Sequence, residues 1–203
     1  CIRDRWYTVS KRSRTYVETI ISKISGEYFK NYQINKIKSK NNGVDLYYGG
    51  NSEFFDYDKV IIATHADEAL AMIENPTDQE KEILSNYSYK ENIAYIHTDQ
   101  SVMPKNKKAW CSWNSSMKKN EIEKNSITYW LNLLQNLECE ENIFLTLNPY
   151  FEIEGSKILK KVKFTHPYFD QSALDYQSKL KNLQNKRNIL FCGSYFGYGF
   201  HED

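Results

Sequence analysis

The sequence has no apolar run of about 18 residues, the length that a membrane-spanning helix requires. Arg3, Asp4 and Arg5 stand where a secretory signal peptide would need an apolar stretch. Cysteine is scarce, and the four residues stand far apart without a C-x-x-C pair. This spacing excludes a disulfide framework and a cysteine zinc site, and it is typical of a reducing compartment. We therefore expect a cytoplasmic protein.

An excess of charge of one sign is also missing, because 27 Lys and Arg face 26 Asp and Glu. A nucleic-acid-binding protein with a generally basic surface is therefore not expected. The basic loop at residues 105–108 and the pair Lys118 and Lys119 are interpreted as solvated surface, with peripheral contact to anionic lipid headgroups as the alternative. The histidines have no metal-ligand spacing, so no metal site is predicted.

The composition is sufficient for a packed core. The 203 residues are 40% hydrophobic and 15% aromatic, which excludes wholesale disorder. This length fits one domain of ordinary size or two small ones.

The first 90 residues show clear local patterns. Apolar residues spaced i, i+3, i+4 and i+7 predict a helix that begins near Ser13 and ends before Gly26. The turn at residues 41–43 predicts a hairpin between strands at 32–38 and 44–48. Thr77 and Glu80 form a capping box, which predicts the start of a further helix.

Two unbroken β-branched or apolar runs predict strands of a parallel sheet, buried on both faces, at residues 59–63 and 189–192. The residues between these runs predict an antiparallel sheet with strands at 93–97, 109–113, 127–134 and 143–147, then a strand at 158–166 and a helix at 170–185. We therefore expect an α/β domain interrupted by an inserted α+β domain. The outer domain would comprise residues 1–66 and 186–203, and the inserted domain residues 67–185.

Short segments spread over nearly the whole chain carry a family resemblance. They are Trp-Tyr-Thr-Val at 6–9, Ser-Arg-x-Tyr-Val at 13–17, the stretch at 55–67, His-Thr-Asp at 97–99, Met-Pro at 103–104, Ala-Trp-x-Ser-Trp-Asn at 109–114, the stretch at 128–135, Thr-Leu-Asn-Pro at 146–149, His-Pro-x-Phe-Asp at 166–170 and the Gly-rich stretch at 191–203. Together they resemble the flavin-containing amine oxidase superfamily, most nearly its bacterial FAD-dependent, amine oxidase-like branch.

The resemblance implies that the chain is the remainder of an FAD-binding Rossmann-like domain interrupted by a substrate domain. Such proteins open with a strand and a G-x-G-x-x-G turn that holds the FAD pyrophosphate, and no such motif occurs here. Two glycines that usually precede Ser13 are replaced by Lys11 and Arg12. We therefore expect a piece that lacks the first Rossmann unit and does not retain FAD by itself.

Several residues are candidates for contact with the cofactor. Ala63 and Thr64 follow a buried strand, where open α/β sheets place ligands, although Thr64 would also suit a plain helix cap. By resemblance, the strand backbone at Ile34 meets the adenine. The terminal Gly-rich turn would let backbone N–H groups approach a ligand, and its two acidic residues would accept hydrogen bonds from hydroxyl groups. These residues are Gly193, Gly197, Gly199, Glu202 and Asp203.

Two further groups have alternative interpretations. Cys192 with His201 and Asp203 would suit a cysteine hydrolase, but a cysteine that ends an apolar strand is usually a small buried hydrophobe. Trp110, Trp113 and Trp130 are candidates for a substrate wall, with ordinary core packing as the alternative. Strict alternation puts Tyr129 and Trp130 on opposite faces of a strand.

The resemblance implies a flavin-dependent oxidoreductase that removes hydride from a C–N or C–C bond of an apolar or lipid-like substrate. No catalytic residue is identified. The alternative is a non-catalytic binding domain for an apolar ligand or a protein partner. A G-x-G-x-x-G motif encoded upstream would favour the enzyme.

Overall fold

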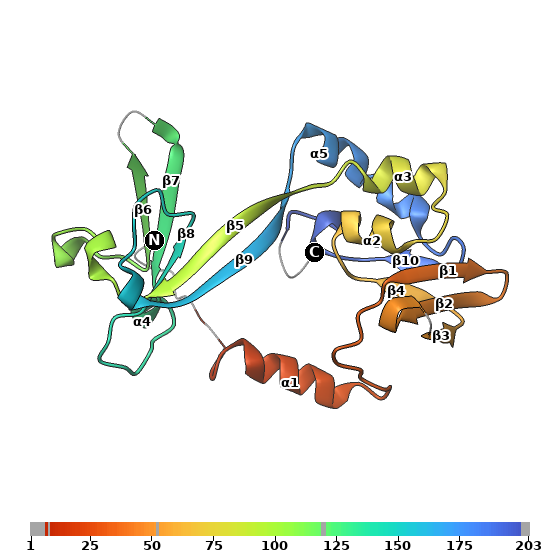
Figure 1. Cartoon of the computed structure of the whole chain (residues 1–203), viewed down its shortest axis with the longest axis horizontal. Helices are drawn as coiled ribbons and strands as arrows, with labels where there is room; N and C mark the ends of the chain where they lie inside the picture. The colour runs from red at the N-terminus through yellow and green to blue at the C-terminus, as the bar shows by residue number, and fades with distance from the viewer. Residues whose placement is uncertain (1–6, 8, 52, 119–120, 200–203) are drawn as a thin grey trace. The chain divides into compact units, whose positions relative to one another are not determined.

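The computed structural model describes residues 7, 9–51, 53–118 and 121–199 (Figure 1). Packing divides the chain into two compact units: residues 1–25 with 91–165 form unit 1, and residues 26–90 with 166–203 form unit 2. The boundaries expected at 66/67 and 185/186 both fall inside unit 2. Because the units reflect packing and not roles, the assignment of a cofactor domain and a substrate domain stays a prediction.

Unit 2 is an α/β arrangement with one antiparallel and one parallel sheet. Its helices and strands are β1 (Lys36–Lys40), β2 (Gly43–Tyr48), β3 (Glu53–Tyr57), β4 (Val60–Ile62), α2 (Ala66–Met72), α3 (Asp78–Leu84), α5 (Gln171–Gln177) and β10 (Ile189–Phe191). Strands β1, β2 and β3 form an antiparallel meander in which Lys40 pairs with Gly43, which confirms the predicted hairpin. Strand β3 was not expected, because the residues just before β4 were interpreted as a short polar entry to that strand.

Strands β4 and β10 pair in parallel, with Val60 opposite Ile189 and Ile62 opposite Phe191, as predicted. The expectation that both faces are buried is wrong for the described residues. Ile62 is 3% exposed, whereas its neighbour Ile61 is 65% exposed. In Figure 1 helices α2 and α3 lie to one side of this strand pair. A single covered face therefore explains the alternation between Ile62 and Ile61.

The core of unit 2 joins the helices to both sheets. The capping box is confirmed: Thr77 Oγ1 accepts the Glu80 N–H at 3.2 Å, and Glu80 Oε2 accepts the Thr77 N–H at 2.6 Å. The buried hydrophobic residues of this core are Ile37, Val44, Ile62, Ala66, Ala69, Ile73, Ile83, Leu84, Tyr87, Ala173, Leu180, Leu183, Ile189, Phe191 and Tyr195.

Unit 1 carries most of a five-stranded sheet. Its elements are α1 (Ser13–Lys23), β6 (Trp113–Lys118), β7 (Glu121–Trp130), α4 (Leu131–Leu134) and β8 (Phe144–Leu147). Most residues of two further strands, β5 (Ser88–His97) and β9 (Ile158–Tyr168), also belong to it. The strand order is β6-β7-β8-β5-β9. The pairs β6–β7, β7–β8 and β5–β8 are antiparallel, which confirms the predicted type of sheet. None of the helices in the described part of the chain is long and apolar enough to cross a membrane.

Some predicted bounds are wrong for physical reasons. Residues 109–112 are not a strand, because the Trp110 indole N–H bonds to the Pro104 carbonyl at 2.8 Å and its ring packs against Trp130. Strand β6 begins at Trp113. The strand expected at 127–134 ends at Trp130, where α4 begins. The helix expected at 170–185 breaks after Gln177 and resumes as a 3₁₀ turn at Leu180–Leu183. The helix predicted to begin near Ser13 is confirmed as α1, with Arg12 at its N-cap position.

Candidate functional site

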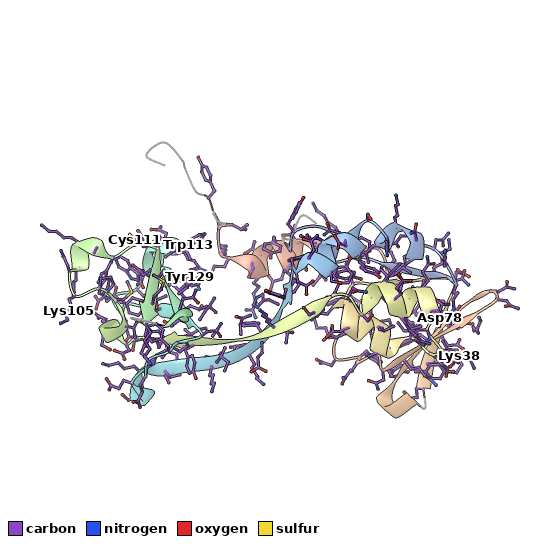
Figure 2. All side chains as sticks on the ribbon, turned by 90° about the horizontal axis from the view of Figure 1, so that it is seen from above. Lys38, Asp78, Lys105, Cys111, Trp113 and Tyr129 are labelled. Carbon is purple, nitrogen blue, oxygen red and sulfur yellow. The ribbon has the colours of Figure 1, made fainter. Side chains whose placement is uncertain are left out.

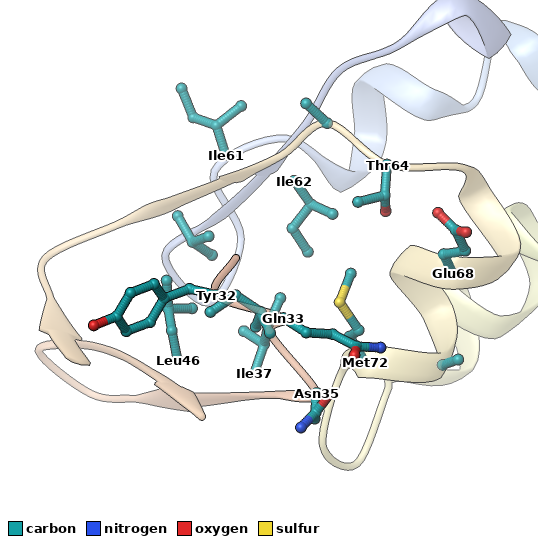
Figure 3. Close-up of a pocket in the computed structure, with 14 residues that line it drawn as sticks. Tyr32, Gln33, Asn35, Ile37, Leu46, Ile61, Ile62, Thr64, Glu68 and Met72 are labelled. Carbon is teal, nitrogen blue, oxygen red and sulfur yellow. The ribbon is translucent and has the colours of Figure 1, made fainter. Parts of the chain in front are cut away.

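A pocket of about 640 Å³ opens in unit 2 beside the end of β4 (Figure 3). The stretch before β1, strand β4 with the two residues after it and helix α2 form most of it, and β1 and β2 each add one residue. The lining residues are Tyr32, Gln33, Ile34, Asn35, Ile37, Leu46, Val60, Ile61, Ile62, Ala63, Thr64, Glu68, Ala71 and Met72. The pocket thus lies at the carboxyl end of a parallel strand, where α/β sheets bind ligands.

The pocket is apolar inside and carries a few polar groups. In Figure 3 the side chains of Ile62 and Met72 point into the space between β4 and α2. Thr64 and Glu68 lie together at one end of this space, and Gln33 and Asn35 come from the stretch before β1. An apolar pocket with a small number of polar groups is typical of a small-molecule or cofactor site.

The backbone of Ile34 has unused hydrogen-bonding capacity at this pocket. Pairing with β2 begins one residue later, where the Asn35 N–H donates to the Tyr47 carbonyl at 2.8 Å. Within the described residues, the N–H and C=O of Ile34 make no hydrogen bond. Since buried or half-buried backbone groups are nearly always paired, a ligand edge with one acceptor and one donor would suit this position.

Three of the predicted cofactor residues, Ile34, Ala63 and Thr64, line one pocket. The resemblance suggested these positions, and the parallel pairing of β4 explains why Ala63 and Thr64 reach the pocket. Glu68 and Met72 were missed. No local pattern identifies them, because the residues of α2 that reach the pocket depend on how this helix packs beside β4.

The Gly-rich turn does not line this pocket. A Cβ on Gly193 would lie 3.7 Å from the Thr64 carbonyl oxygen, so Gly193 is close to the pocket wall. The Gly197 carbonyl accepts a hydrogen bond from the Gln177 side chain. Gly199 has φ of 92°, and a Cβ there would lie 3.0 Å from the Phe169 ring. Glu202 and Asp203 lie outside the described residues, so contact of this turn with a cofactor stays a prediction.

The three candidate tryptophans separate on the two faces of the five-stranded sheet. Trp110 and Trp130 pack edge to face at 5.3 Å, and Trp110 also contacts Phe144. Trp113 instead meets Tyr129, at 6.0 Å and 78°, and is 62% exposed (Figure 2). The predicted opposition of Tyr129 and Trp130 is therefore confirmed. Trp110 and Trp130 belong to a packed cluster, and a role of any of the three in substrate binding stays a prediction.

The face that carries Trp130 is polar but buried. His97 is fully buried, and its Nε2 lies 2.8 Å from Thr146 Oγ1, which in turn lies 2.9 Å from Thr128 Oγ1. The Asp99 N–H donates to His97 Nδ1 at 3.2 Å. Since Nδ1 accepts, the neutral ring carries its proton on Nε2 and donates it to Thr146. This arrangement holds strands β5, β7 and β8 together.

We expect the stability of the fold to fall at low pH, because His97 is buried in its neutral form. Burial lowers the pKa of His97, although the nearby Asp99 carboxylate opposes this. Because the folded pKa lies below that of the unfolded chain, about 6.5, the unfolded state binds the proton more tightly, and stability falls as the pH drops below that value. When urea unfolding at pH 7.5 and at pH 5 is compared, the free energy of unfolding should fall more for the wild type than for His97→Gln. Equal losses would contradict this role.

Cys192 does not match the expected small buried hydrophobe, because its side chain is exposed beyond the end of β10. Its two candidate catalytic partners, His201 and Asp203, lie outside the described residues. No group of three or more metal-ligating side chains occurs in the part of the chain that the structure covers.

Comparison with known proteins gives structural matches only. No family model matches the chain, and no curated protein matches its sequence. A fatty acid isomerase from P. acnes matches with a TM-score of 0.63 and 14% identity over 93% of this chain and 48% of its own. Putrescine oxidase bound to putrescine matches with a TM-score of 0.61 and 10% identity over the same shares. Cyclohexylamine oxidase from Brevibacterium oxydans matches with a TM-score of 0.54 and 8% identity over 84% of this chain and 45% of its own.

These identities are low, so the matches concern the fold. The chain spans about half the length of the solved structures that it matches. Its α/β unit and its five-stranded antiparallel sheet together reproduce part of their architecture. The chain therefore has a partial amine-oxidase-like fold, shared with members of the flavin amine oxidase family.

Proposed function

We propose that the chain is the part of a flavin-dependent oxidoreductase that holds the adenosine end of FAD. The observation that carries this proposal is the gathering of Ile34, Ala63 and Thr64 around one pocket at the carboxyl end of β4. The sequence and its family resemblance predict contact with the cofactor at these three residues. The partial amine-oxidase-like fold supports the same conclusion.

The residues of the pocket fit an adenosine group. Adenine is a flat, largely apolar ring whose edge offers both a hydrogen-bond donor and an acceptor. Ile62, Met72 and Leu46 supply apolar contact, and the unpaired backbone of Ile34 supplies a matching donor and acceptor. The Thr64 hydroxyl and the Glu68 carboxylate lie at one end of the pocket, where ribose hydroxyls would find partners.

The same residues do not fit a pyrophosphate. Glu68 is the single charged side chain in the lining, and it is negative. Phosphate groups need cationic side chains or a cluster of free backbone N–H groups, as a G-x-G-x-x-G turn provides. The chain contains no such motif. We therefore assign the phosphate contacts to a segment outside this chain.

Bound FAD would accept hydride from a C–N or C–C bond of the substrate. In this proposal the chain's own residues bind and orient the adenosine end and keep water away from it.

The substrate would be small and apolar or lipid-like. Among the three candidate tryptophans, Trp113 has the most exposed side chain, so we infer that it is the best placed to meet a ligand without repacking.

A second candidate is a binding domain without redox chemistry. The exposed side chain of Trp113 beside Tyr129 favours it, since an apolar ligand or partner would cover this surface. This candidate needs no nucleotide at the β4 pocket, so nucleotide binding separates the two.

The purified chain should be colourless, because it lacks the residues that hold the pyrophosphate. It should still bind adenosine monophosphate weakly, with a dissociation constant of the order of 1 mM. An absorbance spectrum after desalting and a titration followed by amide chemical shifts measure both. A sample with a flavin band would show that the phosphate site is misassigned. No binding of the nucleotide would favour the binding domain.

A further inference from the structure

We propose that unit 1 binds anionic membrane surfaces through strand β6 and the loop before it. This basic-aromatic surface is defined by Lys105, Lys107, Lys108, Trp113 and Met117. The inference goes beyond the proposed function and holds whether or not the chain binds FAD.

The charge of this segment differs from that of the chain. Residues 100–120 contain five lysines and no acidic residue, whereas the whole chain carries a net charge of +1. Lys105, Lys107 and Lys108 are exposed, and none forms an ion pair with another described residue. Lysines that are not neutralised by neighbours attract an anionic surface, with a contribution of roughly fivefold in affinity for each lysine.

Exposed apolar side chains stand on the adjoining edge strand. Trp113 is 62% exposed and Met117 is 64% exposed. Both lie on the same face of β6, because they are four residues apart in a strand. On the neighbouring strand, Ile127 pairs with Ser115 between them and is 37% exposed. Tryptophan is favoured at membrane interfaces, where one part of its ring system is apolar and the other polar.

Hydrogen bonds hold the backbone of this loop. The Trp110 indole N–H donates to the Pro104 carbonyl at 2.8 Å, and the Asn106 side chain accepts the Lys108 N–H at 3.0 Å. The ring of Trp110 is anchored against Trp130. Because Trp110 and Trp113 lie on opposite faces of the sheet, the loop and Trp113 share its edge, where the loop leads into the edge strand β6.

The residue types favour a bilayer over a nucleic acid. Nucleic-acid sites use arginine for bidentate contact with phosphates and bases, and residues 100–120 contain no arginine. Met117 and Ile127 offer no ring that stacks on a base, but both partition into the boundary between headgroups and acyl chains. Lysine with tryptophan and aliphatic side chains is the combination that interfacial membrane binding uses.

Co-sedimentation of the chain with lipid vesicles tests this inference. Vesicles of phosphatidylcholine with about 30 mole per cent phosphatidylglycerol should bind the chain more tightly than pure phosphatidylcholine, and salt should weaken the binding. The double variant K107Q/K108Q should bind about 25-fold more weakly, at fivefold for each lysine. Trp113→Ser should also weaken binding to anionic vesicles. The matched control K38Q/K181Q removes two exposed lysines of unit 2 and should bind like the wild type.

Circular dichroism confirms that each variant is folded before its binding is interpreted. Equal binding to neutral and anionic vesicles, or an equal loss in K38Q/K181Q, would overturn the proposal. So would binding to a single-stranded oligonucleotide that K107Q/K108Q abolishes while vesicles are not bound. A dimer in light scattering that Trp113→Ser dissociates would assign this surface to a second copy of the chain instead.

Discussion

Replacing Arg187 with Met should lower the free energy of unfolding by roughly 3 kcal/mol. Arg187 Nη1 lies 2.9 Å from Glu80 Oε2, and the Glu80 side chain is 5% exposed. The same guanidinium donates to the carbonyls of Asn75 at 3.1 Å and Glu74 at 3.3 Å. Removal of the cation would leave the buried Glu80 carboxylate with its Thr77 hydrogen bonds but without a neutralising charge, and the two carbonyls without this donor. Urea unfolding followed by circular dichroism measures the loss.

An exposed ion pair gives the matched control. Lys179 Nζ lies 3.4 Å from Glu82 Oε1, and both side chains are about half exposed, at 43% and 55%. Lys179→Met should cost less than about 1 kcal/mol, because solvent screens such a pair. If Arg187→Met cost no more than this control, the connection between α3 and β10 would not depend on the buried pair.

Replacing Ala63 with Phe should weaken the binding of adenosine monophosphate at least about tenfold, which corresponds to 1.4 kcal/mol. Ala63 lines the pocket of about 640 Å³ and is exposed, so we expect a ring at this position to obstruct the opening of the pocket. Because no core residue has to move, the melting temperature should change little. The titration and the melting curve together separate loss of the site from loss of the fold.

Ala109→Phe is the matched control for this substitution. Ala109 is also exposed, but it ends the 3₁₀ turn Lys107–Ala109 in unit 1. The Ala109→Phe substitution should leave the affinity for adenosine monophosphate unchanged. Equal affinity of Ala63→Phe and the wild type would remove this pocket from the site, and equal loss in both variants would indicate a general effect of an added exposed ring.

Local patterns predicted the elements whose stability is local. The capping box of Thr77 and Glu80, the hairpin at Gly43 and the two apolar strands β4 and β10 all appear where the sequence placed them. Each depends on a turn, a cap or an apolar run that neighbouring residues specify. The antiparallel sheet was also expected, since four of its strands carry strand-like periodicity.

The remaining features depend on contacts between distant residues. The exposure of Ile61 follows from which face the helices cover, and the loss of a strand around Trp110 follows from its packing against Trp130. Neither can be inferred from local periodicity. The same reason explains which pocket residues were predicted. Ala63 and Thr64 were predicted from the end of a strand, whereas Glu68 and Met72 line the pocket because α2 packs beside β4.

The central claim is that the β4 pocket receives the adenosine end of a flavin nucleotide. The most direct test is a ¹H–¹⁵N spectrum of the isotope-labelled chain titrated with adenosine monophosphate into the millimolar range. We predict saturable shifts at the amides of Ile34, Ala63 and Thr64, with the five-stranded sheet of unit 1 unaffected. Shifts confined to unit 1, or none at saturating nucleotide, would contradict the account.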